Sequence, residues 1–125
     1  MSGFLNEVNL IPNPCFVMDE ALFEKNMDIL RTLEKKSGAY ILCALKGFSM
    51  WSFFPEMMNY ITGGTASSLN EARLINDEMG VRAHSCFVVY NEEDFQEVQQ
   101  LSSHITFNSI NQFKRFKTKL RDDVE

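Results

Sequence analysis

The sequence predicts an α/β protein in which parallel strands alternate with helices. Short apolar runs alternate with amphipathic segments along all 125 residues, and capping residues or glycines separate many of them. The run 40–46 is apolar at successive positions, which is typical of a strand buried on both faces. Such alternation predicts a parallel sheet covered by helices, either a small open α/β sheet or part of an eight-stranded (β/α) barrel.

The first part of the chain contains two predicted strands and two predicted helices. Residues 13–19 predict a short strand, and Asp19 then predicts the N-cap of an amphipathic helix that ends at Gly38. The apolar run 40–46 predicts the next strand, and residues 50–61 predict a second helix.

The second part repeats the strand–helix pattern three times. Its predicted strands are 63–67, 82–90 and 104–108. The predicted helices between and after them begin at the capping boxes Ser68–Glu71 and Ser109–Gln112, and at Asn91. Because right-handed crossovers bring equivalent strand ends to one side, we expect Lys46, Ser67, His84 and Asn108 to lie near one common edge.

Composition excludes several classes of function. The net charge of −5 argues against nucleic acid as the main partner, since phosphate binding needs a positive field. The three cysteines are an odd number without framework spacing, so no disulfide scaffold is predicted. His84 and His104 pair with no cysteine at ligand spacing, so no metal site is predicted.

Targeting signals and membrane segments are not expected. The stretch MSGFLNEVNL has no basic region followed by an apolar one, so it does not resemble a signal peptide. No apolar run approaches the roughly 20 residues that a membrane span requires. Together with reduced thiols, these features predict a cytoplasmic protein without membrane contact.

Lys46 is the candidate for chemistry because it follows an apolar strand at its carboxyl end. That end carries the active site in both parallel architectures. A lysine there, partly desolvated by apolar neighbours, can form a Schiff base with a carbonyl group. From position alone, a surface turn is the simpler interpretation of Lys46, and a tight turn is the simpler interpretation of the hydroxyl-rich strand end GGTASS at 63–68.

Five stretches together resemble a known family. NPCFVMDEALFEKNMDIL, LCALKGFSMW, GGTASSLNEARL, HSCFVVYNEEDF and ITFNSINQF are similar, in order and spacing, to carboxynorspermidine/carboxyspermidine decarboxylases. These enzymes use pyridoxal 5'-phosphate (PLP) and have an alanine-racemase-like (β/α)8 barrel. The resemblance implies PLP-dependent decarboxylation of a polyamine carboxylate to norspermidine or spermidine, in a homodimer. The ALKGFSMW segment is its most specific part.

The resemblance also implies roles for individual residues. Lys46 matches the lysine that binds PLP covalently, and Thr65, Ser67 and His84 match residues beside the cofactor. Thr62 and Phe87 depart from the family pattern, in which aspartate and serine are common.

Length is the largest departure from the family. Residues 1–125 correspond to the N-terminal half of the barrel, without its second half or the C-terminal β domain. We therefore expect this chain alone to be inactive. Two alternatives remain open: a related PLP decarboxylase acting on diaminopimelate or arginine, and a non-catalytic homologue that binds a partner chain.

Overall fold

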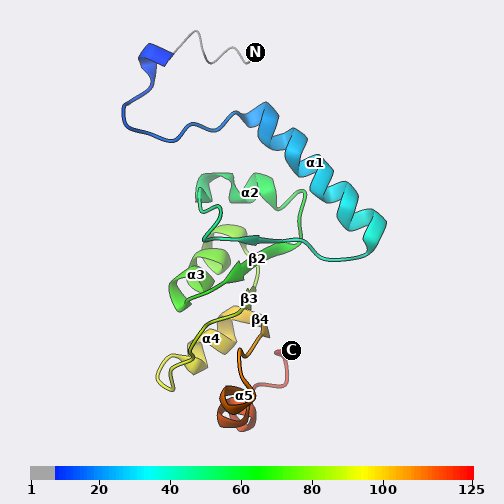
Figure 1. Cartoon of the computed structure of the whole chain (residues 1–125), viewed down its shortest axis with the longest axis vertical. Coiled ribbons are helices and arrows are strands. Elements are labelled where there is room, and N and C mark those ends of the chain that lie inside the picture. Colours follow the sequence, from blue (N-terminus) through cyan, green and yellow to red (C-terminus); the bar gives the residue numbers. More distant parts are fainter. Residues whose placement is uncertain (1–7) are drawn as a thin grey trace.

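The computed structural model describes residues 8–125 and contains one four-stranded sheet (Figure 1). Its strands are β1 (Leu42–Ala44), β2 (Gly63–Ala66), β3 (Ala83–Ser85) and β4 (Ser102–Ile105). They follow one another in chain order, and every neighbouring pair is parallel. The predicted α/β class and the parallel order are therefore confirmed. The prediction about MSGFLNEVNL falls mainly on residues 1–7, outside the described residues.

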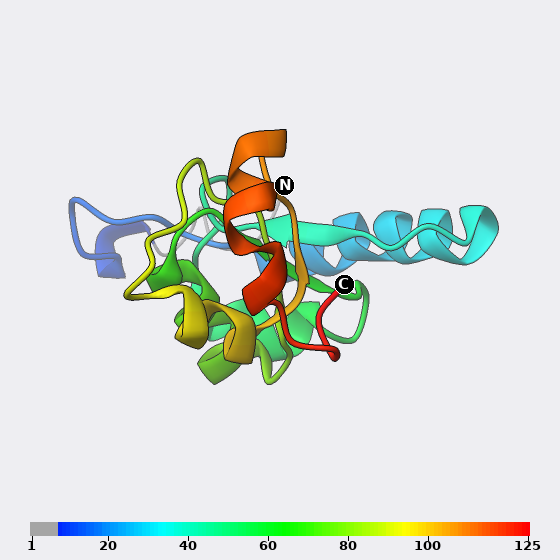
Figure 2. The same cartoon turned by 90° about the horizontal axis from the view of Figure 1, so that it is seen from below.

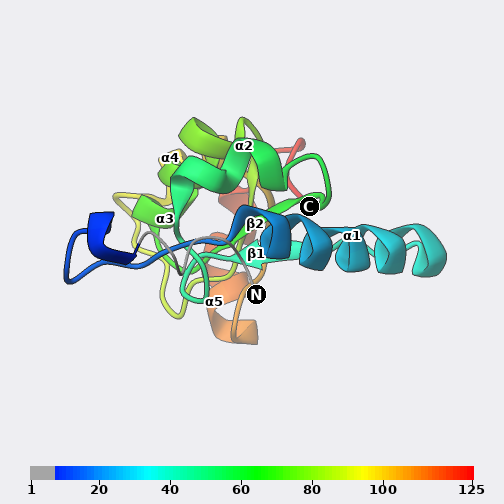
Figure 3. The same ribbon diagram turned by 90° about the horizontal axis from the view of Figure 1, so that it is seen from above.

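Within residues 8–125, five α-helices accompany the sheet. They are α1 (Glu20–Ser37), α2 (Phe54–Met57), α3 (Leu69–Leu74), α4 (Phe95–Leu101) and α5 (Ile110–Phe116). Helix α3 continues as a π-helical turn over Ile75–Met79. Helices α2, α3 and α4 lie on one side of the sheet, whereas the far end of α1 projects beyond it (Figures 2 and 3).

Local capping signals are confirmed at four helix ends. Asp19 Oδ1 accepts a hydrogen bond of 3.1 Å from the Leu22 amide, and Gly38 ends α1 with a left-handed φ of 71°. Ser68 and Ser109 accept hydrogen bonds from the amides three residues later, at 3.3 and 3.2 Å. These contacts satisfy amides that have no partner inside the helix.

Several predicted elements differ from the structure in place or extent. The helix predicted at 50–61 is α-helical only over Phe54–Met57, and the strands predicted at 40–46 and 104–108 are Leu42–Ala44 and Ser102–Ile105. Three further predictions are wrong. Residues 13–19 form no strand, because no described segment pairs with their backbone; the Phe16 side chain is 97% exposed. The strand predicted at 82–90 ends at Ser85, where the chain leaves the sheet as a loop. Asn91 does not cap α4, whose N-cap is Asp94. The Asn91 side-chain Nδ2 instead donates to the Asp94 carboxylate over 3.4 Å.

The two faces of the sheet differ in burial. Ala66, Ala83 and Ser85 are at most 1% exposed beneath the helices. Because side chains alternate along a strand, Thr65 and His84 point to the opposite face, where they are only half-buried. We call this second side the open face.

Candidate active site

One row of paired residues crosses the open face. Ala44 pairs with Thr65, Thr65 with His84, and His84 with His104. Partners in a parallel ladder project to the same side of the sheet, so these four side chains share the open face. Ala44 is small and the other three are polar. The row lies close to the carboxyl ends of the strands, where parallel sheets place their functional groups.

Lys46 lies just beyond β1 in a tight turn. The amides of Gly47 and Phe48 both donate to the Ala44 carbonyl, over 2.8 and 3.1 Å, and so fix this turn. The Lys46 side chain is exposed, so the expected partial desolvation is wrong for the described chain. Its position at the carboxyl end of a strand agrees with the sequence.

Thr65 and Ser67 lie at the end of β2. The Thr65 hydroxyl donates to the His84 carbonyl over 2.9 Å and joins β2 to β3. The Ser67 amide donates to the Glu71 carboxylate over 2.6 Å, which fixes the start of α3. Both side chains are half-buried, and Ser67 borders a cavity of about 230 Å³.

His84 stacks on His104. The two ring centroids are 4.0 Å apart and the ring planes differ by 18°. Burial lowers the pKa of His84, and the positive charge of His104 lowers it further, against the opposing charge of Glu125. A lowered pKa keeps the His84 imidazole neutral over a wider pH range.

Glu125 completes the row beyond β4. Its amide donates to the Ser103 carbonyl over 3.0 Å, and its carbonyl accepts from the Ile105 amide over 2.7 Å. This is the bonding pattern of a parallel ladder opposite His104. Its carboxylate lies 3.2 Å from His104 Nε2.

The sequence did not predict a role for His104 or Glu125. Their pairing depends on strand register, which the motif spacing did not reveal. Asn108, expected at the same edge, is exposed and follows the end of β4 without pairing in the row.

Tyr90 holds the loop after β3 at this edge. Its hydroxyl accepts from the Phe87 amide over 3.2 Å and lies within donating distance of the Ser85 and Thr106 carbonyls, at 3.0 and 3.1 Å. Burial raises the pKa of Tyr90 to about 12. The loop is thus tied to the ends of both β3 and β4. The sequence did not reveal this role of Tyr90, because Tyr90 ends the apolar run that was predicted to be a strand.

Two kinds of feature are absent from residues 8–125. They contain no group of three or more histidine, cysteine or acidic side chains arranged to hold a metal ion. None of their helices is long and apolar enough to cross a membrane. The three cysteines are free thiols.

Known proteins are similar to this chain in sequence. A carboxyaminopropylagmatine decarboxylase from Synechocystis is 38% identical over 90% of this chain and 29% of its own length. Carboxynorspermidine/carboxyspermidine decarboxylases from Herminiimonas arsenicoxydans and Campylobacter jejuni are each 35% identical over 87% of this chain, and 30% and 28% of their own lengths.

A solved structure agrees with these sequence matches. The crystal structure of carboxynorspermidine decarboxylase from Campylobacter jejuni, complexed with norspermidine, superposes with a TM-score of 0.84 at 35% identity. The match covers 87% of this chain and 30% of that one. No family model matches the chain. The chain spans less than a third of the length of these relatives, and over most of its own length it is homologous to the carboxynorspermidine decarboxylases.

Proposed function

We propose that this chain forms one wall of the active site of a PLP-dependent decarboxylase, with Lys46 as the residue that binds PLP covalently. The observation that carries the proposal is the position of Lys46 beyond β1, beside an open polar face, in a chain homologous to decarboxylases. The substrate would be carboxynorspermidine or carboxyspermidine, and the product norspermidine or spermidine.

The residues at this edge fit the aldehyde end of PLP. Lys46 offers a primary amine, and within residues 8–125 it makes no ion pair. Ala44 and Thr65 are small enough to leave room on the open face for a flat ring. When bound, PLP accepts the electron pair left by departing carbon dioxide.

Four side chains have distinct roles in this proposal. The Lys46 amine holds the cofactor. The Ser67 hydroxyl offers a hydrogen-bonding group to the polar substituents of the cofactor. His84, with its lowered pKa, presents a neutral imidazole to the open face. Thr65 fixes the spacing of β2 and β3 through its bond to the His84 carbonyl.

The phosphate of PLP needs a cation or backbone cradle from elsewhere. All five arginines within residues 8–125 already have carboxylate partners: Arg31 with Asp28, Arg73 with Glu97, Arg115 with Glu92, and Arg82 and Arg121 with Asp123. We therefore propose that residues 1–125 act as the N-terminal half of a barrel, and that the complete enzyme is a homodimer. The chain alone would not decarboxylate at a useful rate, because positioning of the cofactor supplies much of the catalysis.

A second substrate is favoured by one observation. The match to the carboxyaminopropylagmatine decarboxylase has 38% identity, against 35% for the carboxynorspermidine decarboxylases. Carboxyaminopropylagmatine is therefore the competing candidate for the complete enzyme.

Covalent labelling tests the assignment of Lys46. The chain is incubated with PLP, reduced with borohydride and digested, and the pyridoxyl label is mapped by mass spectrometry. We expect the label on Lys46, its loss in Lys46→Ala, and no change in Lys117→Ala, which removes another exposed lysine. Preferential label elsewhere, with Lys46 unmodified, would contradict the assignment.

Carbon dioxide release from carboxynorspermidine and carboxyaminopropylagmatine tests whether the rest of the enzyme is needed. We expect the chain with added PLP to be no faster than free PLP. Turnover well above free PLP that is lost in Lys46→Ala would show that these residues suffice.

A further inference from the structure

The open face carries a stacked imidazole pair that ends in a carboxylate. His84 on β3 and His104 on β4 are partners in the ladder, and their rings lie 4.0 Å apart. Glu125 follows opposite His104, with Oε2 3.2 Å from Nε2. Three side chains from separate segments thus form a continuous line across the sheet toward Thr65.

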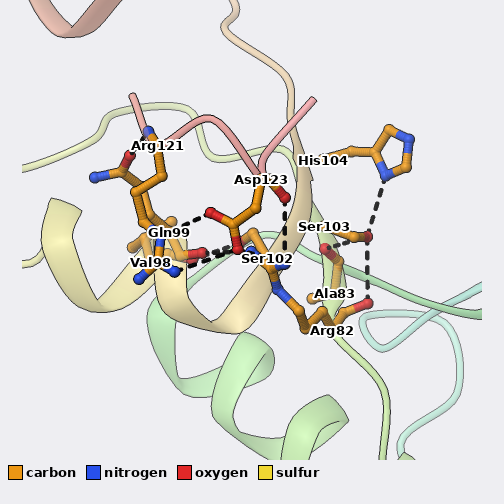
Figure 4. A network of polar contacts seen from close by, with 9 residues as sticks. All are labelled: Arg82, Ala83, Val98, Gln99, Ser102, Ser103, His104, Arg121 and Asp123. Atoms are coloured by element: carbon orange, nitrogen blue, oxygen red, sulfur yellow. Dashed lines mark hydrogen bonds and ion pairs between the residues drawn. The ribbon is translucent and has the colours of Figure 1, made fainter. Parts of the chain in front are cut away.

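The segment that carries Glu125 is anchored independently of its carboxylate (Figure 4). Arg82 donates to the carbonyl and the carboxylate of Asp123 over 3.2 and 3.1 Å, and to the Gln99 carbonyl over 2.9 Å. The Gln99 side-chain oxygen accepts from the Arg121 amide over 2.8 Å. These bonds hold the backbone of residues 121–123 against β3 and α4, so a change at the Glu125 carboxylate leaves the anchor in place.

The other nitrogen of His104 has a fixed partner as well. His104 Nδ1 lies 3.1 Å from the Ser103 hydroxyl, which lies 3.3 Å from the Ala83 carbonyl. Ser103 Oγ also lies 3.5 Å from the Arg82 carbonyl. Both ring nitrogens of His104 thus have a polar partner, Ser103 Oγ at Nδ1 and Glu125 Oε2 at Nε2, and the two contacts together hold the ring in one orientation.

We propose that His104 and Glu125 are positioning residues: Glu125 and Ser103 fix the His104 ring, and the stacked His104 ring fixes the plane in which His84 faces the open side of the sheet. The proposal rests on the proposed function for its purpose, since His84 would face PLP held on Lys46. Two stacked imidazolium rings repel each other, so besides burial the neighbouring His104 also opposes protonation of His84.

The surroundings of His84 limit which charges act on it. β2 presents the uncharged Thr65. β4 presents His104, and the segment beyond it presents Glu125. The two neighbours act on the pKa of His84 in opposite directions, His104 lowering it and Glu125 raising it.

Histidine NMR titration of the chain without PLP tests the arrangement. His104→Phe keeps a stacked ring and removes its charge, so we expect the titration midpoint of His84 to rise. Glu125→Gln keeps an acceptor for Nε2–H and removes the charge, so we expect the lower midpoint of the coupled pair, assigned mainly to His84, to fall. Glu24→Gln, which makes the same charge change on exposed α1, should leave it unchanged.

Opposite shifts in the two variants would support the proposal. A purely structural role for Glu125 predicts the reverse for Glu125→Gln: loosening of the segment would expose His84 to water and raise its midpoint. That rise, or equal midpoints in all variants, would overturn the proposal.

A second measurement separates this proposal from the assignment of Lys46. Pyridoxyl label on Lys46 should shift the ring signals of His84. Label on Lys46 with unchanged His84 signals would overturn the positioning role while leaving the assignment of Lys46 intact. Opposite titration shifts with no label on Lys46 would leave the imidazole arrangement standing and contradict the proposed function.

Discussion

The two ends of the sheet are packed to different extents. At the β4 end, Tyr90, Phe95 and Phe116 are at most 2% exposed, and the rings of Phe95 and Phe116 lie 4.3 Å apart. At the β1 end, Phe54 and Met57 of α2 are equally buried, but the covering helix α1 buries Phe23 alone, and its Leu22, Ile29 and Leu33 are each more than half exposed. A cavity of about 480 Å³ is lined by residues of α1, β1 and α2.

This difference predicts different unfolding behaviour at the two ends. Regions with few buried apolar contacts open locally, whereas densely packed regions open only with global unfolding. The β4 end should therefore set the global stability, and α1 should open at much lower free energy.

Removing a buried ring at the β4 end and an exposed ring in the segment before α1 should give the largest contrast. Phe116→Ala deletes a ring that is 0% exposed, so we expect a loss of about 3–5 kcal/mol in the free energy of unfolding. Phe16→Ala removes a ring that is 97% exposed and should change stability by less than about 0.5 kcal/mol. Urea titration followed by circular dichroism measures both, and equal losses would contradict the comparison.

Alkaline pH should act on the packed end through Tyr90. Burial raises the pKa of Tyr90 from 10 to about 12, so the unfolded chain releases this proton at lower pH than the folded chain. The stability contributed by neutral Tyr90 is complete below pH 10 and is lost as the pH rises toward 12. Tyr90→Phe should be less stable at neutral pH by about 1–3 kcal/mol, since the Phe87 amide loses its partner, and should lack this alkaline loss.

Tyr40→Phe is the matched control for that experiment. The Tyr40 ring is 75% exposed, so the substitution should leave both the neutral stability and the alkaline loss unchanged. Stability is measured by urea titration at a series of pH values between neutral and pH 12. An undiminished alkaline loss in Tyr90→Phe would show that another group titrates.

Helix ends and strand order could be predicted from the sequence, whereas the length of one strand could not. Capping by Asp19 and Ser68 and the glycine at position 38 are local signals, and they placed helix ends correctly. The order of the strands followed from alternation. The strand predicted at 82–90 was too long because the apolar residues 87–90 lie in a loop, in which Phe87 and Tyr90 are buried and Val88 and Val89 are exposed. An apolar run in a loop has the same sequence pattern as a strand.

The site was less predictable than the fold. The position of Lys46 just beyond a strand could be predicted, because the lysine ends an apolar run in the sequence. The partnership of His84, His104 and Glu125 depends on which residues lie opposite each other across three segments, and no local pattern specifies that register. The exposed state of Lys46 depends on what covers the edge of the sheet, which its neighbours in sequence do not determine.

Acidic pH should lower the stability of the β1 end through Glu34. Its carboxylate accepts from the Ile41 amide and the Thr62 hydroxyl, joining α1 to the starts of β1 and β2. Burial alone would raise the pKa of Glu34, but these hydrogen bonds outweigh it, and the pKa is lowered. The contribution of Glu34 is therefore present above its unfolded pKa of 4.5 and is lost as the pH falls through the folded value.

Glu34→Gln tests these hydrogen bonds. The substitution should loosen the contact between the end of α1 and the sheet at neutral pH, and lower the free energy of opening α1 by about 1 kcal/mol. Hydrogen exchange of the α1 amides measures it, with Glu24→Gln on the same helix as the control. Acceleration throughout the sheet, instead of in α1 and the start of β1, would show that the two ends unfold together.

The smallest effects should come from the two helix-ending glycines, and they separate the ends most cleanly. Gly38 and Gly80 have φ values of 71° and 68°, and a Cβ added at either would meet no atom within 4 Å. Alanine at each position therefore introduces the same left-handed strain, about 1 kcal/mol, without a steric clash. Gly38→Ala should speed hydrogen exchange only in the last turn of α1, because that turn opens without the sheet. Gly80 directly follows Met79, which lies in the core and is 7% exposed. The backbone strain introduced by Gly80→Ala should therefore lower the urea midpoint of the whole chain. If Gly38→Ala lowered that midpoint equally, α1 would belong to the same cooperative unit as the β4 end.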